Sequence, residues 1–172
     1  MTTDARTTGR LAALVIALAG LATAAPAAAT ANLALRQSGG MPMALTSEPA
    51  FAYTAGKACD GNPRTGWVAA DTPGETWWGL EWRHPVRLEA VVLRPLVEAA
   101  LGAVALPAAY RLEGRAPGTT AWSTLAEASA AEVGAEGERR HALAAAFEAA
   151  EVRLSVTVEA GRRVGLGDVE CL

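Results

Sequence analysis

The residues best suited to chemistry lie within one short stretch, residues 57–82, which also holds four of the five tryptophans. Within it, Asp-Gly-Asn-Pro at 60–63 is a turn sequence, because Gly and Asn tolerate positive φ and Pro fixes its own φ. Asp60, Asn62 and Thr65 offer carboxylate, amide and hydroxyl oxygens, which are ligand types that Ca²⁺ prefers. The same residues also fit a plain Asx-turn without a metal, so this stretch leaves both interpretations open.

The N-terminal segment has the pattern of a secretory leader. Two arginines precede an apolar run of 14 residues at 11–24, and Ala-Thr-Ala at 29–31 fits a cleavage site. The run is shorter than the ~20 residues that span a membrane, although a retained anchor is the alternative. We expect cleavage of residues 1–31, which leaves residues 32–172 without a membrane span, secreted or held in the periplasm or cell envelope.

Charge and residue content exclude two classes of function. The chain has a net charge of −3 and no basic stripe, so nucleic acid is not an expected partner. Only His84 and His141 could serve as imidazole bases, and no serine is placed as a nucleophile beside either. Without a set of base, orienting group and nucleophile, we expect no enzyme activity.

The two cysteines, Cys59 and Cys171, permit a single disulfide. Export would place them in an oxidising compartment, which favours the bridge. It would close a loop of about 110 residues, and the chain-entropy model gives such a loop ~4–5 kcal/mol of stabilisation before strain. Two buried thiols are the alternative.

The region after residue 31 has the pattern of an antiparallel β-sandwich or barrel, with short β-type runs separated by Gly, Pro, Asp and Asn. The alternation of Val152, Leu154, Val156 and Val158 predicts a strand with these four side chains in the core. We expect strands at 33–37, 42–45, 76–82, 86–94, 109–115, 123–126, 140–143, 151–158 and 166–172.

Other segments are expected to connect or cover these strands. The alanine-rich run 144–150 favours a helical turn or two, since alanine is depleted in strands. Residues 96–107 and 129–137 are expected to form loops. By alternation, Trp78, Leu80 and Trp82 should point to the same side of their strand. No helix longer than about two turns is expected.

The order of motifs resembles a known family. The motifs are Asn-Leu-Ala-Leu at 32–35, Lys-Ala-x-Asp-Gly-Asn-x-x-Thr-x-Trp at 57–67, Thr-Trp-Trp-Gly-Leu-Glu-Trp at 76–82, Tyr-Arg-Leu-Glu-Gly at 110–114, Trp-Ser-Thr-Leu at 122–125, Val-Arg-Leu-Ser-Val at 152–156 and Gly-Leu-Gly-Asp-Val-Glu at 165–170. From residue 32 to 172 the chain resembles the coagulation factor 5/8 type C, or discoidin, domain and the bacterial family 32 carbohydrate-binding modules. The resemblance implies a galactose-binding-like jelly-roll β-sandwich of two antiparallel sheets.

The resemblance also implies a structural calcium site, because bacterial relatives commonly hold Ca²⁺ at the Asp-Gly turn and the last strand. Asp168 stands where Glu is usual in the family, and a side chain shorter by one methylene would loosen or reshape the site. The implied ligands are Lys57 through its carbonyl, Asp60, Asn62, Thr65 and Asp168, with Glu170 as the alternative acid.

The sugar-binding residues of the family are only partly matched. Galactose-binding relatives often place His after the motif tryptophan and an aromatic residue three positions later, where this chain has Val68 and Asp71. Candidate ligand residues at the loop end of the sandwich are Phe51, Tyr53, Asp71 and Arg94. Phe51 is equally suited to plugging the end of the sandwich. Trp67, Trp77 and Trp122 match family core positions, so we expect their indoles to be mostly packing.

The resemblance implies a secreted, non-catalytic module that binds glycans through loops at one end of the sandwich. The alternative is a cell-adhesion or matrix-interaction domain that binds protein or lipid, since this fold serves both uses and the galactose-binding residues are missing.

Overall fold

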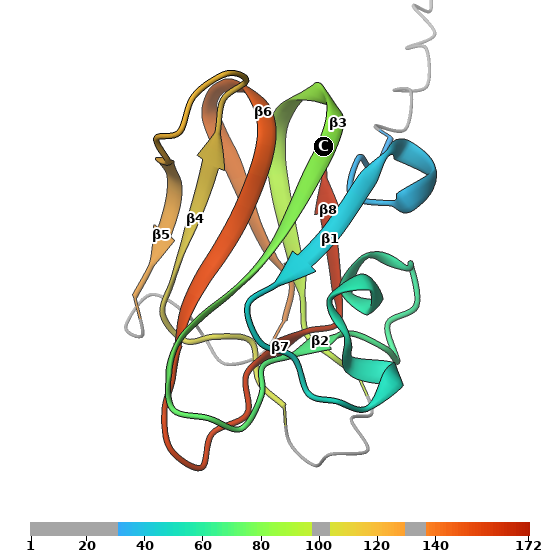
Figure 1. Ribbon diagram of the computed structural model, residues 1–172, viewed down its shortest axis with the longest axis vertical. Coiled ribbons are helices and arrows are strands. Elements are labelled where there is room, and N and C mark those ends of the chain that lie inside the picture. The colour runs from blue at the N-terminus through green and yellow to red at the C-terminus, as the bar shows by residue number, and fades with distance from the viewer. Residues whose placement is uncertain (1–30, 98–103, 130–136) are drawn as a thin grey trace, which may run out of the picture.

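A computed structural model describes residues 31–97, 104–129 and 137–172 (Figure 1). The predicted leader lies outside the described residues, apart from residue 31, as do most of the loops predicted at 96–107 and 129–137. The strands are β1 (Gly40–Ala44), β2 (Trp67–Val68), β3 (Gly74–Arg94), β4 (Tyr110–Arg115), β5 (Ser123–Ala128), β6 (Arg139–Val158), β7 (Gly165–Leu166) and β8 (Asp168–Cys171). Within these ranges the only helices are the short 3₁₀ turns η1 (Arg36–Ser38), η2 (Phe51–Tyr53) and η3 (Ala55–Cys59), and none is long enough to cross a membrane.

Two long strands, β3 and β6, build both layers of the sandwich. They pair antiparallel along most of their length, pass over the top of Figure 1 and continue in the second layer. The first layer has the order β1-β3-β6-β4-β5, whereas β8 pairs with the second half of β3. Register shifts between Glu81 and Val86 and between Leu88 and Ala90 mark the corner, where local irregularity lets a strand bend. The predicted all-β sandwich of antiparallel sheets is confirmed.

The core lies between the layers and follows the predicted alternation. The four aliphatic residues at 152, 154, 156 and 158 are all buried, and so are Trp78, Leu80 and Trp82. The intervening residues of β3 and β6 therefore face outward from the first layer.

Buried indole N–H groups fasten the loops at the lower end and side of the sandwich. Trp67 Nε1 donates to the Thr46 carbonyl at 2.8 Å, and Trp78 Nε1 donates to the Ala55 carbonyl of η3 at 2.9 Å. Because an unpaired buried N–H is costly, these bonds fix the segments that receive them. The loop end, which comprises η2, η3, β2, β7 and the start of β8, is therefore held against the core.

Two local predictions were wrong. Residues 33–37 form a turn and part of η1 instead of a strand, although Leu33 N donates to the Cys171 carbonyl at 2.7 Å and so joins the last strand. Residues 144–150 lie within β6 rather than in a helical turn. Pairing with β3 and the burial of Ala149 outweigh the helix propensity of alanine there.

Candidate functional site

The turn after η3 gathers the oxygen atoms expected from the sequence. Asp60 Oδ1 accepts a hydrogen bond from Asn62 N at 3.0 Å, as in an Asx-turn, and Gly61 has a φ of 74°. The Thr65 hydroxyl lies 3.0–3.1 Å from both Asp60 carboxylate oxygens and 3.2 Å from the Asn62 carbonyl. The Lys57 ammonium lies 3.1 Å from Asp60 Oδ2. The chain thus supplies one cation to this turn itself.

Asp168 approaches the same region from the start of β8. The carboxylates of Asp168 and Asp60 both contribute, after burial, to raising the pKa of the Cys59 thiol to about 11. Asp168 Oδ1 is buried and has no hydrogen-bond partner among the described residues. A buried carboxylate oxygen without a hydrogen-bond partner is the type of group that binds Ca²⁺, as are the carboxylate, hydroxyl and carbonyl oxygens of the Asp60 turn.

Arg94 lies in a cluster of acidic residues rather than facing solvent alone. Its guanidinium lies 3.0 Å from Glu138 Oε2, 3.2 Å from Asp168 Oδ2 and 2.8 Å from Glu170 Oε1. Burial raises the pKa of the Asp168 carboxyl, and the positive charge of Arg94 opposes that rise. Arg94 and Glu170, expected as ligand and alternative metal residue, are therefore paired with each other.

The candidate ligand residues at the loop end differ in exposure. Phe51 is 81% exposed, and the Lys57 ammonium lies 4.8 Å from its ring centroid. Tyr53 is 5% exposed and packs with Val68 and Leu96 in a small second core, so its ring offers no stacking face. Asp71 is exposed in the turn before β3.

Cys59 and Cys171 are both buried thiols of one core cluster. Burial raises the pKa of Cys171, and the charge of Cys59 raises it further. The disulfide itself stays a prediction.

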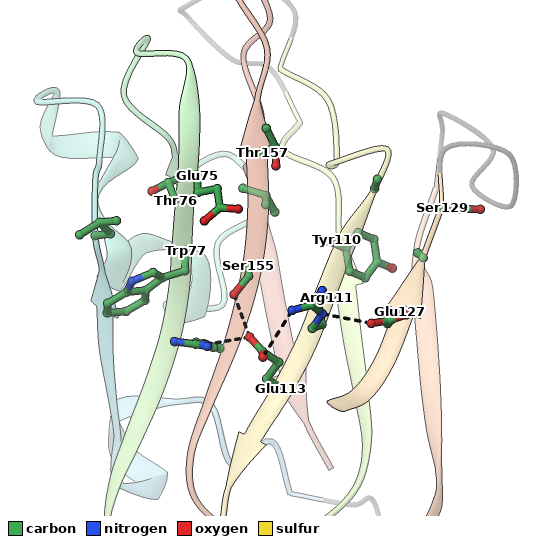
Figure 2. A pocket seen from close by; sticks show the side chains of 15 residues that line it. Glu75, Thr76, Trp77, Tyr110, Arg111, Glu113, Glu127, Ser129, Ser155 and Thr157 are labelled. Atoms are coloured by element: carbon green, nitrogen blue, oxygen red, sulfur yellow. Dashed lines mark hydrogen bonds and ion pairs between the residues drawn. The ribbon is translucent and has the colours of Figure 1, made fainter. Parts of the chain in front are cut away.

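A groove of about 540 Å³ crosses the outer face of the first layer (Figure 2). Its volume is within the range of small-molecule sites. Outward-facing side chains of β3, β4, β5 and β6 line it, and Leu45 closes it beside β1. The lining includes Glu75, Trp77, Arg111, Glu113, Arg153 and Ser155.

Glu113 is the centre of a fixed polar network in the floor of the groove. Arg153 Nε donates to Glu113 Oε2 at 2.8 Å and Ser155 Oγ donates to the same oxygen at 3.0 Å. Arg111 Nη1 lies 3.9 Å from the other oxygen. The Glu113 side chain is only 8% exposed. Burial acts to raise the pKa of Glu113, but the bonds from Arg153 and Ser155 outweigh it, so the pKa lies below its ordinary value.

Two tryptophans expected in the core lie on this outer face instead. Trp77 is half-buried and lines the groove, with its side chain leaning from β3 toward β1 (Figure 2). Trp122 is also half-buried, and the Arg153 guanidinium lies 4.1 Å from its ring centroid. The alternation that buries Trp78 turns its neighbour Trp77 outward. Trp122 thus holds Arg153 in place by a cation–π contact, whereas Trp77 offers apolar surface to the groove.

The lowered pKa of Glu113 makes part of the stability sensitive to acid. A carboxyl whose folded pKa lies below the ordinary 4.5 stabilises the fold at neutral pH, and that contribution is lost as the pH falls through the folded pKa. In urea titrations at decreasing pH, the unfolding free energy of Glu113→Gln should therefore decline less than that of the parent below about pH 4.5. Glu148→Gln, which changes an exposed carboxylate at the corner of β6, outside the groove, is the control and should follow the parent. Equal slopes for parent and Glu113→Gln would contradict this prediction.

No family model and no curated protein matches the chain. Among solved structures, it is similar to chitosan-binding module 2 in complex with chitotriose, from a chitosanase/glucanase of Paenibacillus sp. IK-5, at 23% identity and TM-score 0.64 over 81% of this chain and 98% of that one. It is also similar to the family 32 carbohydrate-binding module of Clostridium perfringens NanJ in complex with galactose, at 15% identity and TM-score 0.66 over 78% of this chain and 94% of that one. An F5/8 type C domain from Bacteroides fragilis matches at 18% identity and TM-score 0.60 over 78% of this chain and 91% of that one. The chain has the galactose-binding-like β-sandwich fold of these structures.

The fold implied by the motif order is thus confirmed, but the groove of this galactose-binding-like domain was missed. From the sequence alone, Glu75, Arg153 and Ser155 resemble the solvent-exposed residues of ordinary strands. The signal that was available is the parity of Trp77, since the residue before a core tryptophan in a strand must point outward.

Proposed function

We propose that this galactose-binding-like domain is a secreted, non-catalytic carbohydrate-binding module whose ligand lies in the sheet-face groove. The observation that carries the proposal is the pairing of the half-exposed Trp77 with the fixed Glu113 network in one groove. Apolar ring faces bind the C–H face of a sugar, while fixed charged groups give strong, directed hydrogen bonds to its hydroxyls. Because the network is already ordered, little side-chain entropy is lost on binding.

The solved neighbours support a carbohydrate as the class of ligand. One is described as a chitosan-binding module in complex with chitotriose, and another as a family 32 module in complex with galactose. Their identities to this chain are too low to pass on a particular sugar or a particular site. The groove, which crosses from beside β1 to β5, spans four strand spacings, or roughly 19 Å. That length favours an oligosaccharide over a single sugar.

The proposed non-catalytic role follows from the state of the groove carboxylate. A general acid needs a raised pKa, but ion pairs hold the pKa of Glu113 below its ordinary value. His141 is hydrogen-bonded to the Tyr110 hydroxyl at 2.6 Å, and burial lowers the pKa of this imidazole. His84 lies at the corner of β3, away from the groove.

We also propose that the turn at Asp60 and the Asp168 carboxylate hold a structural Ca²⁺. The unpaired Asp168 Oδ1 and the oxygens gathered around Thr65 support this. Such an ion would supply positive charge that draws the last strand to the turn, and it would act on stability rather than on the ligand.

Glycan binding is tested by comparing a groove variant with a loop-end variant. A glycan array identifies the ligand, and titration calorimetry then measures the parent, Trp77→Ala and Phe51→Ala. We expect Trp77→Ala to weaken binding about tenfold, which corresponds to about 1.4 kcal/mol, and Phe51→Ala to leave it unchanged. Loss of affinity in Phe51→Ala alone would move the site to the loop end. Binding to liposomes or collagen without any glycan would refute the carbohydrate function.

A further inference from the structure

Glu75 is the unpaired charged side chain of the groove. It is exposed on the outward row of β3, and it has no ion pair or hydrogen bond with a described residue. Figure 2 shows its carboxylate reaching from β3 toward β6, above Ser155. The other carboxylates differ, because Glu113 is bonded to Arg153 and Glu127 accepts a 3.0 Å bond from Arg111. A ligand therefore meets one uncommitted negative charge.

The charged side chains of the groove also carry a net negative charge. Three carboxylates, Glu75, Glu113 and Glu127, face two guanidiniums, Arg111 and Arg153, so these five side chains sum to −1. An acidic sugar would have to displace an existing ion pair from an arginine and would meet repulsion from Glu75. A sugar with a protonated amine would instead gain a partner without breaking any pair.

The positions of Trp77 and Glu75 suit adjacent units of one chain. Residues two apart on one face of a strand lie about 6.8 Å apart along it. Trp77 leans toward β1 and Glu75 toward β6, so a chain that crosses the strands passes both side chains (Figure 2). A ring stacked on Trp77 then places the substituent of its neighbour near the Glu75 carboxylate.

We infer that the groove takes an oligosaccharide of amino sugars with free amines, stacked on Trp77 and paired through an ammonium group to Glu75. The inference rests on the proposed carbohydrate-binding function and adds the chemical class of the ligand. The contact is electrostatic, so the preference for the amine should weaken as salt is added.

The test compares two ligands that differ only at nitrogen. Titration calorimetry at mildly acidic pH, where the sugar amines are protonated, uses a glucosamine hexamer and its fully N-acetylated counterpart. The parent should bind the free-amine hexamer about fivefold more tightly, the upper range for one exposed ion pair. Glu75→Gln should lose this preference and keep its affinity for the acetylated hexamer. Glu148→Gln, which removes the same charge from the corner of β6, outside the groove, should keep the preference.

The outcomes separate this inference from the function on which it rests. Equal affinity of the parent for the two hexamers, or an amine preference that survives in Glu75→Gln, would overturn the amino-sugar inference. Binding of neutral glycans that is lost in Trp77→Ala would still support the carbohydrate function in that case. Failure to bind either hexamer or any glycan would overturn both.

Discussion

Reduction of the protein comprising residues 32–172 should lower its free energy of unfolding by ~4–5 kcal/mol, the value that the chain-entropy model gives for opening the loop of about 110 residues between Cys59 and Cys171. Cys59 lies at the end of η3 and Cys171 at the end of β8, so a bridge would tie the Asp60 turn to the last strand. Both side chains are buried in the same core cluster. Urea titrations with and without reductant measure the loss.

The thiol content provides the control for this prediction. Protein that is unfolded without reductant and titrated with Ellman reagent should show no thiols if Cys59 and Cys171 are joined. Two thiols per chain would contradict the bridge, and the unfolding free energy would then be the same with and without reductant. The raised pKa of both groups would in that case keep them as unreactive buried thiols.

Chelation of calcium should lower the melting temperature, because an ion bound only by the folded state stabilises it. The effect is ~2.7 kcal/mol when free Ca²⁺ is a hundred times its dissociation constant. Asp60→Asn should abolish the response, since it replaces the negatively charged carboxylate, to which Thr65 and Asn62 are hydrogen-bonded, with a neutral amide. Asp71→Asn, an exposed carboxylate outside the turn, should keep it. Differential scanning calorimetry with added Ca²⁺ or chelator measures both.

Two cations of the chain, Lys57 and Arg94, already neutralise the carboxylates of the proposed calcium site. An equal melting temperature with calcium and with chelator would mean that Lys57 and Arg94 suffice as cations. Lys57 already contacts Asp60, and Arg94 already contacts Asp168. The turn would then be a plain Asx-turn held by the Thr65 hydroxyl.

The sequence predicted the fold because the core of a sandwich repeats every second residue. Val152 to Val158 and Trp78 to Trp82 alternate cleanly, and their burial follows that pattern. Residues 144–150 were misassigned, since their strand is imposed by pairing with β3, which lies far away in the sequence. Single-residue propensity carries no information about such a partner.

The candidate site could be predicted only where its contacts are local in the sequence. The Asp60 turn is local, so its hydrogen bonds follow from residues within five positions of each other. The groove network joins Glu113 to Arg153, which is 40 positions away, through the register of β4 with β6. Register between distant strands is a tertiary property, and the outward residues alone resemble any solvated face.

The most direct test of the groove is a ligand titration followed by nuclear magnetic resonance. The glycan found by array screening, or the glucosamine hexamer, is added to isotope-labelled protein comprising residues 32–172. We expect the largest shifts at the Trp77 indole N–H and at the backbone amides of Ser155 and Glu113, with Phe51 and Asp71 unchanged. Shifts confined to Phe51, Asp71 and the rest of the loop end would contradict binding in the sheet-face groove.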